Sequence, residues 1–140
     1  IKMVDIYRKV KVFNETFGVK LLNEPAAQIE GAFLNYKLMK EENEEYLEAV
    51  LDDDKVEVFD ALLDQLTVLF GNFQKHGFSY ELIEKGMEEV YRSNMSKLDN
   101  GKVKKRDDGK ILKGKHYFKP NLKDILLKAE KNGGKQIKEE

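Results

Sequence analysis

Acidic side chains interrupt an apolar stretch near the middle of this chain, and they constrain its fold more than any other feature. Glu57, Asp60 and Asp64 lie among large apolar residues, namely Val56, Phe59, Leu62, Leu63, Leu66, Leu69, Phe70 and Phe73. A helix that is apolar around most of its circumference is expected to be buried. Ionised carboxylates are costly to bury unless they are paired or bind a metal ion. The stretch therefore predicts a buried helix that carries a cation site.

Composition favours a helical globular protein. Apolar residues make up 41% of the 140 residues and charged residues 36%, with two prolines and no run of about 20 apolar residues that would span a membrane. The absence of cysteine excludes disulfide frameworks, thiolate zinc sites and thiol nucleophiles. No basic-then-apolar leader pattern is present, so a cytoplasmic location is the expectation.

Hydrophobic periodicity predicts an all-α fold, a four- to five-helix bundle with antiparallel metal-binding helices and an extended basic C-terminal tail. The expected helices span residues 4–17, 25–51, 55–76 and 79–94, followed by a short last helix that ends at Leu127. One domain is predicted over residues 1–127, with a hairpin or extended excursion at residues 98–120. Residues 128–140 are expected to be disordered.

The acidic residues of the second helix fit the motif Glu-Glu-x-x-Glu in two registers. The first uses Glu41, Glu42 and Glu45, and the second uses Glu44, Glu45 and Glu48. Residues three and four apart share a helix face. Glu42 and Glu45 continue an apolar stripe that begins at Leu34 and Leu38, so they are predicted to face inward. The neighbouring stripe, which starts at Lys37, is predicted to face solvent.

A short turn at residues 52–54 would make the second and third helices antiparallel neighbours, so that their acidic residues converge. A hard cation such as Mg²⁺ or Mn²⁺ fits a site made of oxygen ligands. Zinc would require His or Cys ligands, and the two histidines, His76 and His116, lie near predicted loops and read as surface residues. The alternative is an acidic helix surface with a few buried, paired acids.

Charge is distributed unevenly along the chain. Residues 1–96 carry 11 basic and 19 acidic side chains, whereas residues 97–140 carry 14 basic and 7 acidic side chains. An acidic body with a basic tail is suited to hold a cation and a phosphate chain together. The alternative is a tail of solvated lysines.

These motifs resemble those of the all-α nucleoside triphosphate pyrophosphohydrolases, which include MazG-like proteins, dimeric dUTPases and phosphoribosyl-ATP pyrophosphohydrolases. The similarity rests on Glu-Glu-x-x-Glu followed by Glu57-x-x-Asp60, on residues 60–64 with Gly71, and on Arg92-Ser93-Asn94-Met95-Ser96-Lys97. It continues through Arg106, Gly109-Lys110, Leu112-Lys113-Gly114 and Tyr117, and covers residues 4–127.

The resemblance implies Mg²⁺-dependent hydrolysis of a nucleoside triphosphate to the monophosphate and pyrophosphate, a housekeeping reaction on the nucleotide pool. Glu42, Glu45, Glu57 and Asp60 match the metal ligands of the family, and Asp64 is a further ligand or an acceptor one turn along. The expected substrate-binding residues are Asn94, Lys97, Arg106, Lys110, Lys113 and Tyr117. Lys97 is also expected to act in catalysis by taking up charge on the departing pyrophosphate. Some family members use the residue that corresponds to Glu41 to activate water.

Three alternatives stay open. Phosphoribosyl-ATP hydrolysis in histidine biosynthesis uses the same chemistry, a non-catalytic helical binding or regulatory module could keep the scaffold, and the basic tail alone would suit a nucleic-acid binder. The third helix is apolar around so much of its circumference that three other helices of one chain would not cover its apolar surface. A homodimer or homotetramer is therefore expected, with substrate sites near the subunit boundary.

Overall fold

The computed structural model describes the backbone of residues 1–139 and the side chains of residues 1–130. The described residues form no strand, and the helices are α1 (Met3–Thr16), α2 (Ala32–Leu51), α3 (Lys55–Lys75), α4 (Tyr80–Met95) and α5 (Leu122–Glu139). The predicted all-α fold is confirmed. No helix within the described part of the chain is long and apolar enough to cross a membrane. The chain divides into two compact units, Ile1–Ser79 and Tyr80–Glu140.

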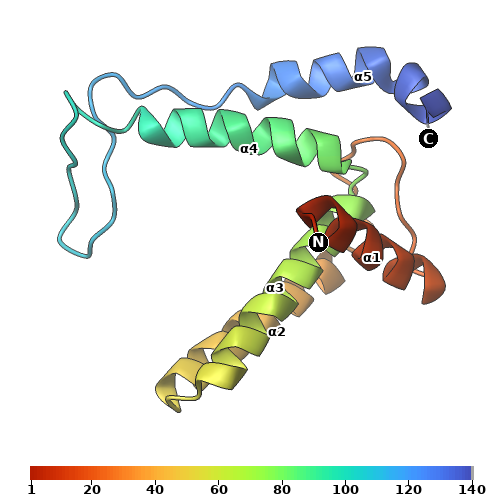
Figure 1. Ribbon diagram of the computed structural model, residues 1–140, viewed down its shortest axis with the longest axis horizontal. Coiled ribbons are helices and arrows are strands. Elements are labelled where there is room, and N and C mark those ends of the chain that lie inside the picture. The colour runs from red at the N-terminus through yellow and green to blue at the C-terminus, as the bar shows by residue number, and fades with distance from the viewer. Residues whose placement is uncertain (140) are drawn as a thin grey trace. The chain divides into compact units, whose positions relative to one another are not determined.

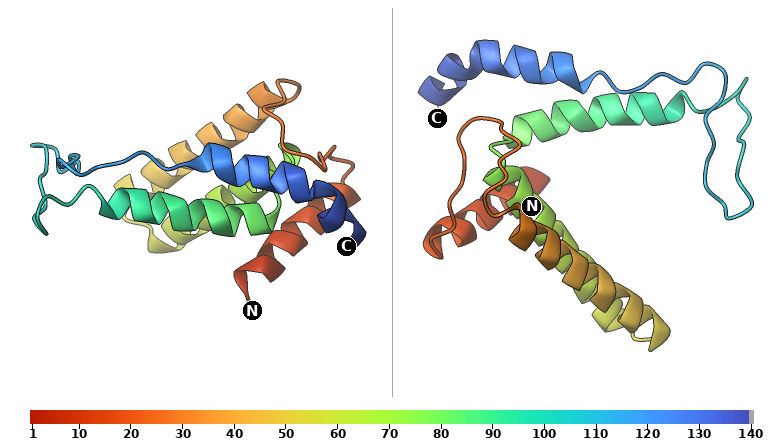
Figure 2. Two further views of the ribbon diagram at one scale, coloured as in Figure 1. Left: turned by 90° about the horizontal axis from the view of Figure 1, so that it is seen from above. Right: turned by 180° about the vertical axis from the view of Figure 1, so that it is seen from behind.

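In the first unit, α2 and α3 lie side by side in opposite directions, as Figures 1 and 2 show. The tight turn between them places Asp53 in the left-handed region with φ of 52°, which Asp tolerates better than most residues. Asp54 then caps α3 by accepting a hydrogen bond from the backbone N–H of Glu57 at 3.1 Å. Ala49 and Ala61 are both buried in this pair. The predicted antiparallel arrangement follows from this capped turn.

Buried amides fasten α1 to the C-terminal part of α3. The Gln74 side chain donates to the carbonyl oxygen of Tyr7 at 2.9 Å and accepts from Asn14 Nδ2 at 3.2 Å. The Tyr7 ring meets Phe70 edge to face at 5.5 Å between centroids, and its hydroxyl donates to the carbonyl of Phe78 at 2.7 Å. Gln74 is only 3% exposed, so these hydrogen bonds compensate the cost of burying its amide.

The prediction that the second helix begins near Pro25 was wrong, because α2 begins at Ala32. The preceding segment is instead hydrogen-bonded to the end of α3: the N–H of Ala26 donates to the carbonyl of His76 at 2.9 Å. Gln28 and Gly31 have φ of 41° and 78°, values that a right-handed helix does not allow. Residues 19–31 therefore form an irregular strap beside α3 rather than the first two turns of α2.

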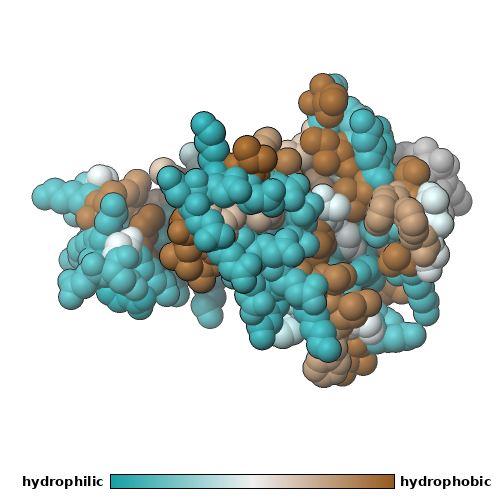
Figure 3. All heavy atoms as spheres, turned by 90° about the horizontal axis from the view of Figure 1, so that it is seen from below, coloured by the Kyte–Doolittle hydropathy of each residue, from teal (hydrophilic) through white to brown (hydrophobic). Residues whose placement is uncertain are grey.

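The residues that the structure describes leave much of α3 uncovered, contrary to the expectation of a buried helix. Its exposed apolar residues are Val56, Phe59, Leu62, Leu63 and Leu69, with exposed fractions of 43% to 68%. Figure 3 shows apolar surface, in brown, between hydrophilic areas on one face of the molecule. Within a single chain, the apolar surface of α3 exceeds what its neighbours bury.

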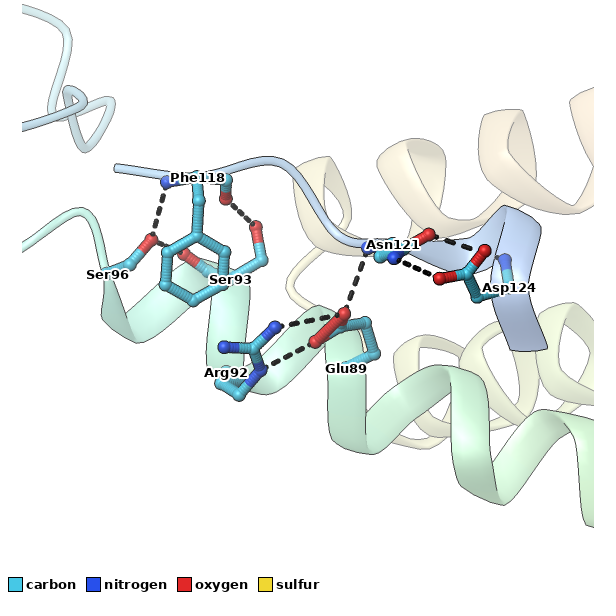
Figure 4. Close-up of polar contacts among 7 residues, drawn as sticks. All are labelled: Glu89, Arg92, Ser93, Ser96, Phe118, Asn121 and Asp124. Atoms are coloured by element: carbon cyan, nitrogen blue, oxygen red, sulfur yellow. Dashed lines mark hydrogen bonds and ion pairs between the residues drawn. The ribbon is translucent and has the colours of Figure 1, made fainter. Parts of the chain in front are cut away.

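In the second unit, α4 is joined to the segment before α5 by a polar network that Figure 4 shows. Ser93 is 2% exposed and donates to the carbonyl of Phe118 at 2.8 Å, while the Phe118 N–H donates to Ser96 Oγ at 3.2 Å. Arg92 lies over the Phe118 ring and pairs with Glu89, which also accepts from the N–H of Asn121. These contacts fix where the chain returns to α4.

The excursion between α4 and α5 contains two isolated antiparallel bridges, Asp99 with Lys102 and Lys105 with Ile111. The last helix runs to Glu139, past Leu127 where the sequence predicted its end. Side chains from residue 131 onward and the backbone of residue 140 lie outside the described residues. The predicted disorder of residues 128–140 and the predicted single domain over residues 1–127 stay predictions.

Replacing Gly77 with Ala should destabilise the first unit strongly. Gly77 has φ of 76°, and a Cβ atom there would overlap with the backbone carbonyl of Glu24 in the strap. The free energy of unfolding should fall by on the order of 3 kcal/mol because left-handed strain and a backbone clash act together. Gly18→Ala is the matched control, since Gly18 has φ of 74° with open space around it, and should cost only about 1 kcal/mol. Urea denaturation of both variants measures the difference, and equal losses would contradict the strap contact.

Candidate functional site

The α2–α3 pair brings acidic residues of both helices to one place. Gln65 on α3 is hydrogen-bonded to α2 beside these acidic residues. Its Nε2 donates to Asn43 Oδ1 at 3.2 Å and to the Glu42 carbonyl at 3.4 Å. Helical spacing puts Glu42 and Glu45 on one face of α2. The same spacing puts Asp60 and Asp64 on one face of α3. Acidic residues that are 15 to 22 positions apart along the sequence therefore converge, because the chain doubles back at the Asp turn.

Three carboxylates form a compact cluster. Glu42, Glu45 and Asp64 each offer one carboxylate oxygen, and these oxygens all lie within 4.8 Å of one another. Glu42 and Asp64 are half-buried, whereas Glu45 is exposed. Oxygen donors from two helices, open to solvent on one side, suit a hard divalent cation that keeps some of its water.

The electrostatics of this cluster favour the binding of a cation. Burial, followed by the charges of Glu45 and Asp64, raises the pKa of Glu42 to about 7. Burial, with the charges of Asp60 and Glu45, also raises the pKa of Asp64. The Oε2 atom of Glu42 is buried and has no hydrogen-bond partner in the part of the chain that the structure describes. A bound cation would offset this repulsion and coordinate the unpaired oxygen, so the residues fit a metal ion.

Glu57 and Asp60 lie beside this cluster rather than within it. Both line an acidic pocket of about 290 Å³ at the turn end of the helix pair, whose other lining residues are Glu45, Glu48, Ala49, Asp52, Asp54 and Ala61. Asp60 is close enough to raise the pKa of both Glu42 and Asp64. Glu45 belongs to the cluster and to the pocket, and therefore connects the predicted ligands of the two motifs.

The two registers of the acidic motif differ in their surroundings. Glu41 and Glu44 are exposed, and Glu44 lies 3.9 Å from Lys40 in a surface ion pair. Glu48 lines the acidic pocket but is not one of the three clustered carboxylates. The register with Glu42 and Glu45 facing α3 is therefore the one whose side chains meet Asp64.

The predicted substrate-binding residues all lie in the second unit, on or after the end of α4. Arg106 is paired with Asp108, which raises the pKa of the arginine, and the Lys113 ammonium lies 4.7 Å from the centroid of the Tyr117 ring. Lys97 is half-buried, while Asn94 and Lys110 are exposed. The roles predicted for Asn94, Lys97, Arg106, Lys110, Lys113 and Tyr117 in binding a phosphate chain stay predictions.

Sequence reasoning missed a polar pair at the other end of α2 and α3. Lys75 Nζ donates to Asn35 Oδ1 at 2.8 Å, beside a second pocket in the first unit. Asn35 is 8% exposed. The available signal was an amide between Leu34 and Leu38, on the stripe that leads to Glu42. Lys75 gave no such signal, because a lysine in the last turn of a helix usually serves the helix dipole.

Comparison with known proteins finds one relevant family. A family model described as phosphoribosyl-ATP pyrophosphohydrolase matches residues 10–94, which is more than half of the chain. No curated protein matches the sequence. The matched region extends from α1 to the end of α4 and contains every acidic residue of the cluster and all those of the pocket. It ends before the basic excursion.

The metal-free protein should lose stability as the pH rises. The native state keeps the proton of Glu42 up to a pKa of about 7, whereas the unfolded chain releases it near the ordinary value of 4.5. The free energy of unfolding should therefore fall between pH 4.5 and pH 7 and level off above pH 7. Urea denaturation in the presence of a chelator, repeated across this pH range, measures the effect.

Glu42→Gln should remove the contribution of Glu42 to this pH dependence, leaving that of Asp64, whose pKa is also raised, and should stabilise the metal-free protein at pH 8 by on the order of 2 kcal/mol. Glu41→Gln is the matched control, because this neighbouring side chain is exposed, and should leave the pH profile as it is in the wild type. A Glu42→Gln profile that follows the wild-type curve would show that Glu42 is not the group that titrates.

Proposed function

Because this chain belongs to the phosphoribosyl-ATP pyrophosphohydrolase family, we propose that it hydrolyses a nucleoside triphosphate to the monophosphate and pyrophosphate with Mg²⁺. The family is part of the MazG-like nucleoside triphosphate pyrophosphohydrolase superfamily, so the resemblance predicted from the motifs is confirmed. The chain is accordingly a pyrophosphohydrolase that acts on a nucleotide. The observation that carries the finer proposal is the cluster of three carboxylates within 4.8 Å inside the matched region.

Glu42, Glu45 and Asp64 would hold the cation, and Asp60 and Glu57 would extend the site towards the acidic pocket. When bound, Mg²⁺ would offset the charge of the triphosphate and acidify a water molecule, and Mn²⁺ would serve as a substitute. The spread of acidic groups from the cluster to the pocket leaves room for a second ion. The half-buried setting of Glu42 and Asp64 strengthens their interaction with a cation compared with the same groups in water.

Glu41 is the residue that we assign to accept a proton from the attacking water. It is exposed and directly precedes Glu42 in α2, so its carboxylate stays solvated next to the cluster without being one of the three clustered groups. Its neighbour Lys37 lies one turn earlier on the same solvent-facing stripe. Proton transfer to a positioned carboxylate is ordinary general base catalysis.

Phosphoribosyl-ATP is the second candidate substrate, and the description of the matching family favours it. Its hydrolysis also yields pyrophosphate from a nucleoside triphosphate group, so the acidic site would serve both reactions. A non-catalytic helical module is disfavoured by the five acidic positions, since a scaffold without turnover has no need to keep so many carboxylates together.

Pyrophosphate release tests the proposal. The protein is incubated with Mg²⁺ or Mn²⁺ and a panel of canonical, deoxy and modified triphosphates plus phosphoribosyl-ATP, and pyrophosphate and phosphate are detected separately. We expect pyrophosphate from a small number of triphosphates. Glu57→Gln and Asp60→Asn should each lower kcat by at least about 100-fold with helicity retained, whereas Glu44→Gln should keep activity within about twofold. Phosphate release, or full activity of both acidic variants, would contradict the proposal.

We also propose that the protein is a homodimer or homotetramer in solution. The exposed apolar side chains of α3 support this, because a contiguous apolar face on a single chain is typical of a subunit interface. Val56 and Leu69, with exposed fractions of 68% and 43%, lie at the two ends of this face.

Leu69→Glu should shift the molar mass measured by light scattering from a multiple of 16.3 kDa towards 16.3 kDa, because burying an unpaired carboxylate in the interface is costly. Val103→Glu is the control, since Val103 is a comparably exposed apolar residue of the excursion, outside α3. A wild-type mass of one chain at working concentration would refute the oligomer.

A further inference from the structure

A second pocket, of about 450 Å³, lies in the first unit at the end of the α2–α3 pair opposite to the Asp turn. It is bounded by the end of α1, the strap, the start of α2 and the end of α3. Its apolar lining includes Phe13, Val19, Leu22, Leu34 and Leu38. This volume falls within the range of small-molecule sites, which are mostly apolar with a few placed polar groups.

Several polar side chains also line the pocket. Lys20 and Glu30 form a strongly exposed ion pair at 4.0 Å, and the His76 ring lies 3.0 Å from the Ala26 carbonyl, whereas Lys75 and Asn35 form the more deeply buried polar pair. Lys75 is half-buried and donates to Asn35 Oδ1 at 2.8 Å, and burial lowers the pKa of Lys75. Among the residues that the structure describes, none forms an ion pair with this ammonium group. An ammonium has three N–H donors, so Asn35 accounts for one of them. The wall of the pocket therefore holds a cationic donor with capacity for a further acceptor.

The hydrogen bond between Lys75 and Asn35 also determines which side-chain atom of Asn35 remains available to bind a ligand. An ammonium group has no acceptor, so the side chain of Asn35 must turn its oxygen towards Lys75. Its Nδ2 then remains as a donor. Lys75 and Asn35 together present two adjacent N–H donors to a ligand. A carbonyl oxygen has two lone pairs and can accept hydrogen bonds from both donors. A ring nitrogen has only one in-plane lone pair and can accept one. An amino group is itself a donor and cannot accept a hydrogen bond from either.

The pocket and the acidic cluster share one face of α2. Leu34, Leu38 and Glu42 follow at intervals of four residues, so they lie one above the other along the helix. Asn35 precedes Glu42 by seven residues, which corresponds to about 10 Å along the helix axis. A nucleotide whose phosphates lie at the cluster would thus extend its sugar along α2 and its base towards the pocket.

We propose that this pocket binds the base of the nucleotide and that Lys75 and Asn35 select bases with a ring carbonyl, namely uracil, thymine, cytosine and guanine, over adenine. The inference rests on the proposed function for the identity of the ligand. Apolar residues, with Phe13 at the mouth, enclose the faces of the planar ring. Lys75 and Asn35 donate to its carbonyl oxygen. Adenine has no carbonyl, so it would bury these donors with incomplete hydrogen bonding, and the pocket would therefore favour the triphosphate of a carbonyl base over phosphoribosyl-ATP, the second candidate substrate.

Binding to the metal-free protein tests the pocket separately from turnover. Dissociation constants for dUMP, dGMP and dAMP are measured by ligand-observed NMR in the presence of a chelator, and kcat and KM are measured with Mg²⁺ for the matching triphosphates. The wild type should bind dUMP and dGMP at least tenfold more tightly than dAMP. Saturation should be transferred to base protons more strongly than to sugar protons.

Lys75→Met keeps the apolar stem but removes the donors. It should weaken dUMP and dGMP binding about tenfold, leave dAMP binding within about twofold, and raise KM while kcat changes little. Asn35→Asp keeps the size and can still pair with Lys75, but it replaces a donor by an acceptor. This second variant should lower or invert the preference for carbonyl bases. Lys9→Met, an exposed lysine of α1 outside the pocket, is the control and should behave as the wild type.

Each outcome decides one of the two proposals. A wild type without preference among the three monophosphates, or an unchanged preference in folded Lys75→Met and Asn35→Asp, would overturn the pocket inference even if pyrophosphate is released. A carbonyl preference that both variants remove would support the pocket even if no triphosphate is hydrolysed, and the proposed reaction would then fail alone. Absence of both binding and turnover would overturn both proposals.

Discussion

Repulsion among carboxylates held between two antiparallel helices is the constraint on which this structure depends. The capped turn at Asp53 and Asp54 makes α3 double back along α2, and the oxygens of Glu42, Glu45 and Asp64 then lie within 4.8 Å of one another. Partial burial prevents water from screening these charges fully, which raises the pKa of Glu42 and Asp64. The cluster is costly for the metal-free helix pair, and the cation that we propose would offset this cost while it binds the polyphosphate.

The opposite end of the same helix pair is organised by amides. Gln74 accepts from Asn14 and donates to the backbone of Tyr7, so α1 is held by directional hydrogen bonds as well as by the contact between Tyr7 and Phe70. The strap of residues 19–31 closes over the end of α3, where Gly77 leaves space for the backbone of Glu24. This arrangement creates the pocket that contains Lys75. One helix pair thus carries an acidic end and an apolar end with a cationic donor, in the order in which a nucleotide carries phosphates and base.

Several charged side chains of the second unit interact with other residues of that unit. Arg106 pairs with Asp108, Lys104 pairs with Asp99, and Lys113 lies against the ring of Tyr117. The serines that follow Arg92 serve the fold, because Ser93 and Ser96 hold the backbone of Phe118 against α4. Part of the Arg-Ser-Asn-Met-Ser-Lys motif therefore has a structural explanation. The positive charge of the tail remains in excess even so, since residues 97–140 carry twice as many basic as acidic side chains.

The sequence by itself determined the helical class, the limits of α1, α3 and α4 to within a few residues, and the set of acidic side chains, because apolar periodicity and capping residues act locally. It could also favour Glu42 and Glu45 over their neighbours, since helical spacing alone separates the two faces. Tertiary structure decided the rest. Pro25 would suit a helix start, yet hydrogen bonds between the strap and residues 74–76 hold it outside α2. Asp64 rather than Glu57 belongs to the cluster, and Lys75 contacts Asn35. Both contacts depend on how two antiparallel helices are aligned lengthwise after the turn that joins them. Such pairings join residues 19 to 40 positions apart, and no local pattern in the sequence specifies them.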